Sequence, residues 1–407
     1  MPIRVLAEPV VQMIAAGEVI ERPASVVKEL VENSLDAAAR RIRVRVSGAG
    51  LSEISVSDDG SGIPREEVEL AFARHATSKL SSVEDLARLR TLGFRGEALA
   101  SIAAVSDVTL STTHEQEESG SRLRVAFGEK LDSGPCAVAR GTTVTVQDLF
   151  ANVPARRRFL RKPATEVQHM IGVISRYAVA HPEVAFSLSL DGREVLRTFG
   201  GGLLDAMRRV YGPETGDALL PFDYEDRGIK AFGYASPPDL HRASSRQMDV
   251  FVNGRWIQDR MLTRAMMEAY RTLLPTGRYP IACLLLEVPS DRVDVNVHPA
   301  KSEVRFAEPD LVFQVALRAI RTANSPASFV PPLPTSHSWE EARASSQEAL
   351  SRLASGLARA EGPLTEAPTA PGTWASAQRV RARSSGSGRS ASRAPGPGSA
   401  SPSGSIP

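Results

Sequence analysis

Hydrophobic and polar positions change from a helical to a strand period early in the chain. From residue 23 to about 39, apolar residues recur every three or four positions, which predicts a helix with one buried arc. The apolar positions of this helix are Val26, Val27, Leu30, Val31 and Leu35. Residues 41–47 then alternate arginine with isoleucine or valine, which predicts a strand with one buried face. Residues 54–58 repeat the strand pattern and end in a glycine-rich turn.

The same mixture of patterns continues through residues 1–200. We expect helices near 64–74, 83–90, 96–104 and 164–180, and strands near 105–113, 121–127 and 141–147. Helices followed by hairpin-like pairs of strands favour an α+β sandwich. In such a fold, helices cover one face of a mixed, mostly antiparallel sheet.

Three consecutive glycines, Gly200–Gly202, indicate a seam between two domains. Beyond them we expect strands near 229–234, 248–253 and 281–288, and helices near 260–273 and 308–323. The pattern therefore predicts one domain over residues 1–204 and a second over residues 205–330.

Residues 331–407 differ from the rest in composition, since 48 of these 77 positions are Pro, Ala, Ser or Gly. Such a segment buries too little apolar surface to offset its ordering entropy, which predicts a disordered linker or tail. Residues 338–357 carry a capping-box pattern and leucines at helical spacing. They are either a partner-binding helix or a transient helix within the linker.

Composition and charge bound the function. The net charge of +2 and the hydrophobic content of 42% are ordinary for a globular protein, and the tail alone carries +3. The body is therefore not a generally basic nucleic-acid binder, and DNA contacts must come from local patches.

Cys136 and Cys283 lack metal-ligand spacing and are expected to be two buried thiols. No apolar run reaches the length of a membrane span, so we expect a cytoplasmic protein.

Glu29, Asn33 and Asp36 form a polar stripe along the first helix. Their spacing places an acid and an amide side by side at the edge of the hydrophobic arc. This arrangement suits a general base beside a metal ligand. Taken alone, it is equally typical of a solvated helix surface.

Glycine-containing turns supply further candidates. A D-x-G-x-G turn over residues 58–62 combines a carboxylate that can accept from an amine with glycines that admit a flat base. Residues 93–99 place two glycines and an arginine before a helix, where free N–H groups can meet phosphate. Each motif alone is also typical of an ordinary loop. No Walker-type phosphate loop occurs in the sequence.

These elements, in this order, resemble the GHKL ATPases, which share the Bergerat nucleotide fold. That superfamily includes gyrase B subunits, heat-shock chaperones, sensor histidine kinases and MutL proteins. Longer stretches resemble MutL mismatch repair proteins in particular; they are residues 12–23, 93–102, 152–160 and 294–301. The resemblance spans roughly residues 1–325. It implies a GHKL sandwich followed by a transducer domain like ribosomal protein S5.

The resemblance also implies roles for single residues. Glu29 would be the base that activates water, and Asn33 would be the Mg²⁺ ligand. Asp58 would bind adenine with support from Thr143, and Lys301 of the second domain would reach the γ-phosphate. Asp36 would support the pocket. The residues expected to contact the nucleotide or form its lid are Gly62, Thr77, Ser78, Lys79, Gly93, Phe94, Arg95, Gly96, Glu97, Ala98 and Leu99.

Arginines in two segments are candidates for DNA contact. They are Arg156, Arg157, Arg158 and Arg161 in the first domain, and Arg255, Arg260 and Arg264 in the second. The first group can equally form a solvated turn, and Arg255 can equally be a surface charge. His298, between Val297 and Pro299, is expected to be structural.

The family resemblance implies a slow, DNA-stimulated ATPase that couples mismatch recognition to repair enzymes. The implied partners are DNA, a MutS-family protein, a downstream endonuclease or helicase, and a second copy paired through the N-terminal domain. The nicking members of the family carry a metal site in a C-terminal domain, and nothing similar occurs here, so no intrinsic endonuclease is expected. A gyrase-like subunit and a scaffold that binds ATP without hydrolysing it are the alternatives.

Overall fold

The computed structural model describes residues 16–17, 19–74, 76–77, 92–93, 96–294 and 304–325. The chain divides into two compact units, residues 1–331 and 332–407, and every described residue lies in the first. The predictions for residues 83–90, for His298 and for the linker with its segment 338–357 lie outside the described residues. The domain bounds at 204 and 330 stay predictions.

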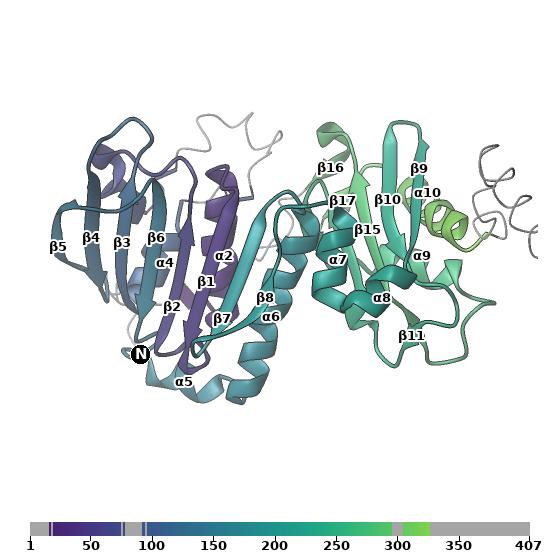
Figure 1. Ribbon diagram of the computed structural model, residues 1–407, viewed down its shortest axis with the longest axis horizontal. Helices are drawn as coiled ribbons and strands as arrows, with labels where there is room; N and C mark the ends of the chain where they lie inside the picture. The colour runs from purple at the N-terminus through teal and green to yellow at the C-terminus, as the bar shows by residue number, and fades with distance from the viewer. Residues whose placement is uncertain are drawn as a thin grey trace, which may run out of the picture. The chain divides into compact units, whose positions relative to one another are not determined.

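The first unit contains two larger sheets (Figure 1). The strands of the first sheet are β1 (Arg41–Ser47), β2 (Glu53–Asp58), β3 (Asp107–Thr113), β4 (Gly120–Ala126), β5 (Glu129–Cys136), β6 (Gly141–Gln147), β7 (Ala185–Leu190) and β8 (Arg193–Arg197). Their order in the sheet is β5-β4-β3-β6-β2-β1-β7-β8. Within this sheet β1 and β7 pair in parallel, and the other neighbours pair antiparallel, as the mixed pattern predicts.

Helices cover the apolar face of the first sheet. They are α2 (Pro23–Asp36), α4 (Ala98–Ala104) and α6 (Pro163–Ala180), with the short α5 (Pro154–Phe159) before α6. Helix α2 begins with Pro23 in its first turn, where a missing N–H costs nothing. It ends at Asp36, and Ala38 then takes the left-handed conformation that stops a helix.

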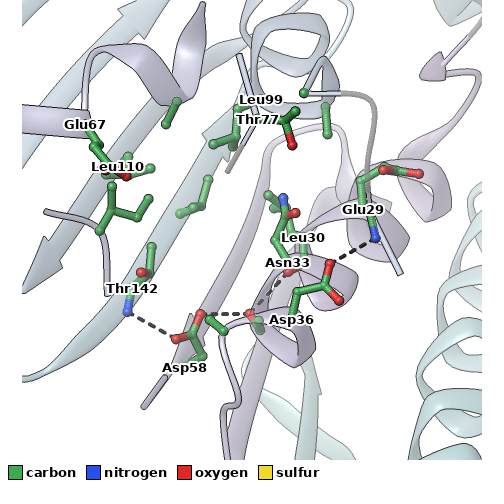
Figure 2. A pocket seen from close by; sticks show the side chains of 18 of the residues that line it. Glu29, Leu30, Asn33, Asp36, Asp58, Glu67, Thr77, Leu99, Leu110 and Thr142 are labelled. Atoms are coloured by element: carbon green, nitrogen blue, oxygen red, sulfur yellow. Dashed lines mark hydrogen bonds between the residues drawn. The ribbon is translucent and has the colours of Figure 1, made fainter. Parts of the chain in front are cut away.

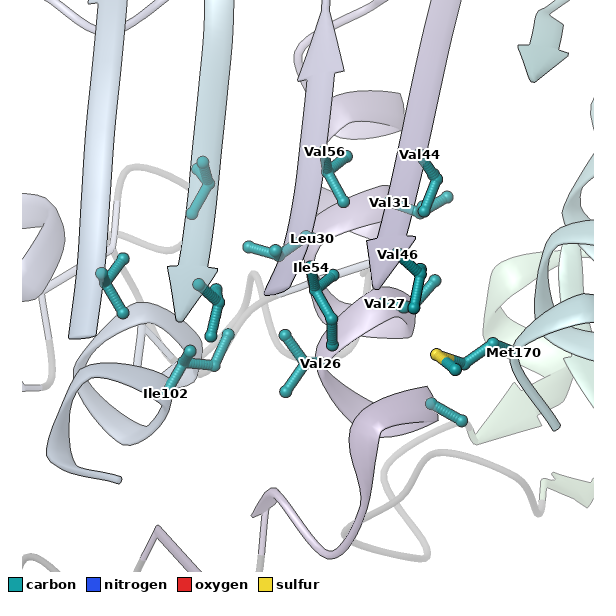
Figure 3. Packing of buried hydrophobic residues seen from close by; sticks show 14 of the residues in the cluster. Val26, Val27, Leu30, Val31, Val44, Val46, Ile54, Val56, Ile102 and Met170 are labelled. Carbon is teal, nitrogen blue, oxygen red and sulfur yellow. The ribbon is translucent and has the colours of Figure 1, made fainter. Parts of the chain in front are cut away.

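The core lies between α2 and the first sheet (Figure 3). Val26, Val27 and Leu30 of α2 are buried in one cluster with Ile54 and Val56 of β2. Burial of each such side chain stabilises the fold by roughly 1.5–3 kcal/mol. The apolar arc of α2 is thereby fixed on the sheet, and this sets the direction in which its polar stripe faces.

The second sheet has the order β13-β12-β15-β10-β9. Its strands are β9 (Leu220–Asp226), β10 (Ile229–Ala235), β12 (Met248–Val252), β13 (Arg255–Ile257) and β15 (Ala282–Glu287). Two further pairs are β11 (His241–Arg242) with β14 (Tyr279–Pro280), and β16 (Val293–Asp294) with β17 (Arg305–Phe306). The remaining helices are α7 (Leu203–Tyr211), α8 (Pro213–Ala218), α9 (Arg260–Ala269) and α10 (Pro309–Ala323).

The two faces of the second sheet are buried against different helices. One face packs with α9 and α10, for example Leu284 with Met266 and Val315. The other face packs with Val179 of α6 and Met207 of α7 through Phe251 and Cys283. The second sheet is therefore joined to α6 by an apolar contact.

Several sequence predictions need correction. Residues 64–74 form two 3-10 turns, Arg65–Glu67 and Leu70–Phe72, and not one helix. Strand β5 is missing from the prediction because it is an exposed edge strand without apolar alternation. Cys136 is only partly buried, whereas Cys283 is buried, and both are free thiols.

Ile54→Ala should lower the free energy of unfolding by about 2–5 kcal/mol, because Ile54 is fully buried and truncation leaves a cavity. Urea denaturation followed by circular dichroism measures this change. Arg43→Ala, an exposed position on the neighbouring strand β1, is the control and should stay within about 0.5 kcal/mol of the parent. Equal losses in both variants would contradict the packing described for β2.

Candidate functional site

A cavity of about 640 Å³ opens between α2, the ends of β2 and β6, and the segment before α4 (Figure 2). A cavity of this size can hold a ligand as large as a nucleotide. Its lining combines polar groups from α2 with apolar side chains such as Ile63, Leu110 and Val144. The cavity thus has the mixed lining of a specific ligand site.

The polar stripe of α2 forms one wall of this cavity. Glu29, Asn33 and Asp36 all line it, so the stripe is not a solvated helix surface. The Glu29 carboxylate lies 3.4 Å from Nζ of Lys28. Burial lowers the pKa of Lys28, but the charges of Glu29 and Glu32 outweigh this effect and raise that pKa above its ordinary value. Lys28 is therefore a fixed positive charge beside Glu29.

Asp58 lies at the other end of the cavity and accepts three hydrogen bonds. The Ser34 hydroxyl donates at 2.8 Å, and the backbone N–H groups of Gly60 and Thr142 donate at 3.0 and 3.2 Å. Burial raises the pKa of the Asp58 carboxyl, and these three hydrogen bonds oppose that shift. Ser34 is absent from the sequence prediction because its partner lies 24 positions away in the chain.

Thr142 lines the cavity, and Thr143 does not belong to its lining. The Thr143 hydroxyl instead donates to Ser57 Oγ at 2.9 Å, between β6 and β2. Successive side chains of a strand point to opposite faces, and Val144 and Val146 of β6 face the core. This alternation assigns Thr142 to the cavity side, so the placement of Thr143 beside Asp58 is corrected.

Asp36 holds the segment that precedes α4. Its two carboxylate oxygens accept from the backbone N–H groups of Leu92 and Gly93, at 2.8 and 2.9 Å. Gly96, with φ of +60°, lies so close to Ala76 that an added Cβ would be 2.2 Å from the Ala76 carbonyl oxygen. Only glycine permits this approach. Asp36 thus supports the pocket by anchoring the backbone at its edge.

A buried polar pair lies beneath the same wall. The Tyr177 hydroxyl of α6 donates to Glu32 Oε1 at 2.6 Å, and Lys28 Nζ lies 3.3 Å from the same oxygen. Burial, together with the charge of Glu32, raises the pKa of Tyr177 well above its ordinary value, so the phenol stays protonated. The sequence prediction does not include Glu32 or Tyr177.

The cavity brings together most of the predicted nucleotide residues that the structure describes. Its lining includes Gly62, Thr77, Gly93, Gly96, Glu97, Ala98 and Leu99. Ser78, Lys79, Phe94, Arg95 and Lys301 lie outside the described residues. Within the described part of the chain, no three His, Cys, Asp or Glu side chains gather as a metal site.

The candidate DNA arginines fall into three classes. Arg157, Arg158, Arg161, Arg260 and Arg264 are exposed, as a DNA contact requires. Arg156 is partly buried beside Gly17, where an added Cβ would meet its guanidinium. Arg255 is only 6% exposed, so its prediction as a DNA contact or a surface charge is wrong.

Family models match two segments of the chain. Residues 20–143 match the family described as histidine kinase-, DNA gyrase B-, and HSP90-like ATPase. Residues 207–325 match the C-terminal domain of DNA mismatch repair proteins. The first segment contains α2, β2 and the cavity's polar groups.

Similar proteins and structures agree with these models. The DNA mismatch repair protein MutL of Desulforudis audaxviator is 48% identical over 322 residues, which is 79% of this chain and 57% of that protein. MutL of Anaeromyxobacter dehalogenans is 47% identical, over 79% of this chain and 54% of that protein. This chain therefore spans about half the length of these relatives.

Solved structures confirm the predicted fold class. The Aquifex aeolicus MutL ATPase domain complexed with ADP is 30% identical, with a TM-score of 0.54, over 73% of this chain and 98% of that one. The N-terminal domain of a DNA repair protein is 27% identical, with a TM-score of 0.66, over 77% of this chain and 97% of that one.

None of the helices described here is long and apolar enough to cross a membrane.

Ser34→Ala should raise the pKa of Asp58 further, because the lost hydroxyl stabilises the carboxylate. NMR titration of the Asp58 carboxyl carbon measures the shift. Ser61→Ala is the control, since the Ser61 hydroxyl lines the cavity but bonds to Gly62. An unchanged or lower pKa in Ser34→Ala would show that the hydroxyl does not hold the carboxylate charged.

Proposed function

Because this chain belongs to the MutL family of DNA mismatch repair proteins, we propose that it binds ATP and hydrolyses it slowly. In this proposal the ATP cycle couples mismatch recognition to downstream nicking and strand removal. One observation carries the proposal: a single helix, α2, presents Glu29 and Asn33 to a cavity whose far end holds the partly buried carboxylate of Asp58.

The Asp58 end of the cavity suits adenine. A carboxylate held by three donors keeps acceptor capacity for the exocyclic amine of the base. Gly62 has a φ of +74° and an added Cβ would meet the backbone of Thr113, so only glycine fits at this position of the cavity wall. Thr142, which bonds to Asp58 through its backbone, adds a hydroxyl to this end.

The α2 end suits the phosphates and Mg²⁺. The amide oxygen of Asn33 is a hard ligand of the kind that Mg²⁺ prefers, so Asn33 would hold the ion at this end of the cavity. When bound, the ion neutralises phosphate charge. The family resemblance assigns the lid over the phosphates to residues 93–99 and the contact with the γ-phosphate to Lys301.

Glu29 is the general base in this proposal. Its carboxylate takes a proton from the water that attacks the γ-phosphorus, while the bond from that phosphorus to the oxygen of ADP breaks. Lys28, whose Nζ lies 3.4 Å from the carboxylate, holds it in place. The lid must close before this step, so ATP binding and lid closure are coupled.

The wider role that we propose for this chain in repair is the one that its resemblance to the MutL family implies. ATP favours pairing of two N-terminal domains, with residues 1–20 as the exchanged segment, and hydrolysis releases them. DNA lies along the exposed arginines of α5 and α9, and its binding stimulates turnover. The partners are a MutS-family protein and a downstream endonuclease or helicase, in the cytoplasm at the nucleoid. Residues 1–204 are the ATPase domain, 205–330 the transducer and 331–407 the linker.

Glu29→Ala should bind ATP with parent affinity and lose about 10²- to 10⁴-fold in turnover, since the general base is removed. Turnover with and without DNA and binding of a fluorescent ATP analogue measure the two effects. Glu67→Ala, another acid of the cavity lining, is the control and should keep its turnover. Undiminished turnover in Glu29→Ala would contradict its assignment as the base.

Asn33→Ala should lose the dependence of nucleotide binding on Mg²⁺, because the protein's ligand to the ion is gone. Titration of the ATP analogue with Mg²⁺ and with a chelator measures that dependence. In the parent, Mg²⁺ should tighten binding; in the variant, the two titrations should coincide. If Mg²⁺ tightens binding equally in both proteins, Asn33 is not the ligand.

A further inference from the structure

Tyr177 of α6 is a buried tyrosine whose hydroxyl contacts the helix that carries the polar stripe. The hydroxyl donates to Glu32 Oε1 at 2.6 Å, across 145 positions of the chain. The phenol ring belongs to the same apolar cluster as Val27 and Val31 of α2, and Glu32 is only 4% exposed. Water has little access to this oxygen, so the Glu32 carboxylate depends on donors from the protein.

Lys28 links Glu32 to the proposed base. Its Nζ lies 3.3 Å from the same Glu32 oxygen and 3.4 Å from Glu29 Oε1. One ammonium group is thus shared between two carboxylates at almost equal distances. Glu29 and Glu32 are three positions apart on one helix, so their side chains are neighbours on its surface. A continuous path of contacts therefore runs from the Tyr177 hydroxyl to the Glu29 carboxylate.

The charges around the phenol keep it a hydrogen-bond donor. Burial and the charges of Glu32 and Glu29 raise the pKa of Tyr177 well above its ordinary value. The charge of Arg255 on β13 opposes this shift but does not cancel it. The hydroxyl therefore stays protonated and keeps its proton for the bond to Glu32.

The position of the Lys28 ammonium depends on how well Glu32 is satisfied. With the phenol in place, Glu32 Oε1 accepts from a hydroxyl and also faces the ammonium. Without the hydroxyl, a buried carboxylate loses a donor and attracts the neighbouring ammonium more strongly. The flexible stem of lysine allows the ammonium to follow. It would then move away from Glu29.

We infer that Tyr177 is a positioning residue that keeps Lys28 on the Glu29 carboxylate by holding Glu32. The inference rests on the proposed ATPase function and extends it to α6, a helix that contributes no residue to the cavity lining. The proposed base is then held from behind the cavity wall. Any movement of α6 that withdraws the hydroxyl also displaces the ammonium beside the base.

Tyr177→Phe removes the hydroxyl and keeps the ring. We expect turnover to fall about 10- to 100-fold, because displacement of a catalytic group by about 1 Å can cost this much. The affinity for a fluorescent ATP analogue should equal that of the parent, since the change leaves Asp58 and its donors intact. Steady-state turnover and titration with the analogue measure the two effects separately.

Tyr211→Phe is the matched control. The Tyr211 hydroxyl of α7 also donates to an acid, Asp249 of β12, at 2.9 Å, and Asp249 keeps two other donors at 3.1 Å. Urea denaturation should show a loss in the free energy of unfolding in both variants, whereas the turnover of Tyr211→Phe should equal that of the parent. Parent-like turnover in Tyr177→Phe, or an equal loss in Tyr211→Phe, would overturn the inference.

A double-mutant cycle with Lys28→Met tests the path itself. Methionine keeps the length of the side chain and removes its charge, so this variant alone should lose turnover. Adding Tyr177→Phe should then cause no further loss, because both changes act on the same contact with Glu29. If the two losses multiply, Tyr177 acts by another route and the inference is wrong.

Crystal structures without nucleotide supply a test that needs no turnover. In Tyr177→Phe, the distance from Lys28 Nζ to the Glu29 carboxylate should exceed about 4 Å, the limit of an ion pair. In the parent and in Tyr211→Phe it should stay near 3.4 Å. An unchanged distance in Tyr177→Phe refutes the inference even if the parent hydrolyses ATP. A parent that fails to hydrolyse ATP refutes the proposed function alone.

Discussion

The packing of α2 on β2 is the constraint on which the site depends. Val26, Val27 and Leu30 lock the helix over Ile54 and Val56, and this sets the rotation of α2 about its own axis. Glu29 and Asn33 project into the cavity only at this rotation, and only then can Ser34 donate to Asp58 across the gap. Apolar contacts between α2 and β2 therefore determine the distance between the two ends of the cavity.

Polar groups in and beside the cavity are held by hydrogen bonds and ion pairs. Asp58 has three donors, Glu32 has Tyr177 and Lys28, and Asp36 has two backbone amides. A buried polar network rigidifies a structure when its members are satisfied, because every alternative arrangement leaves a group unpaired. This cost holds the helix, the sheet and the start of the lid in one arrangement. It also explains why charged residues can lie so close to the apolar core.

The sequence predicts the elements whose pattern is local. The α2 stripe and the D-x-G-x-G turn follow from spacing within a few residues, and in the structure Glu29, Asn33 and Asp36 all line one cavity. The role of Thr142 could also have been predicted, since side chains alternate along β6 and Thr142 and Thr143 therefore lie on opposite faces of the sheet. The roles of Ser34 and Tyr177 could not be predicted from the sequence, because their hydrogen-bond partners are 24 and 145 positions away. Arg255 shows the opposite error: an arginine in a polar motif looks exposed, but the structure buries it in the second sheet.

Strand β1 has a consequence for synthesis of the chain. Its parallel partner β7 begins at Ala185, so β1 stays at a sheet edge until that distant segment has been translated. An edge strand offers unpaired N–H and C=O groups to any other extended chain. The exposed arginines of β1, at positions 41, 43 and 45, repel a second copy of the same strand during this interval. The alternating arginines thus protect a nascent chain from aggregation, a role they no longer need once β7 has paired.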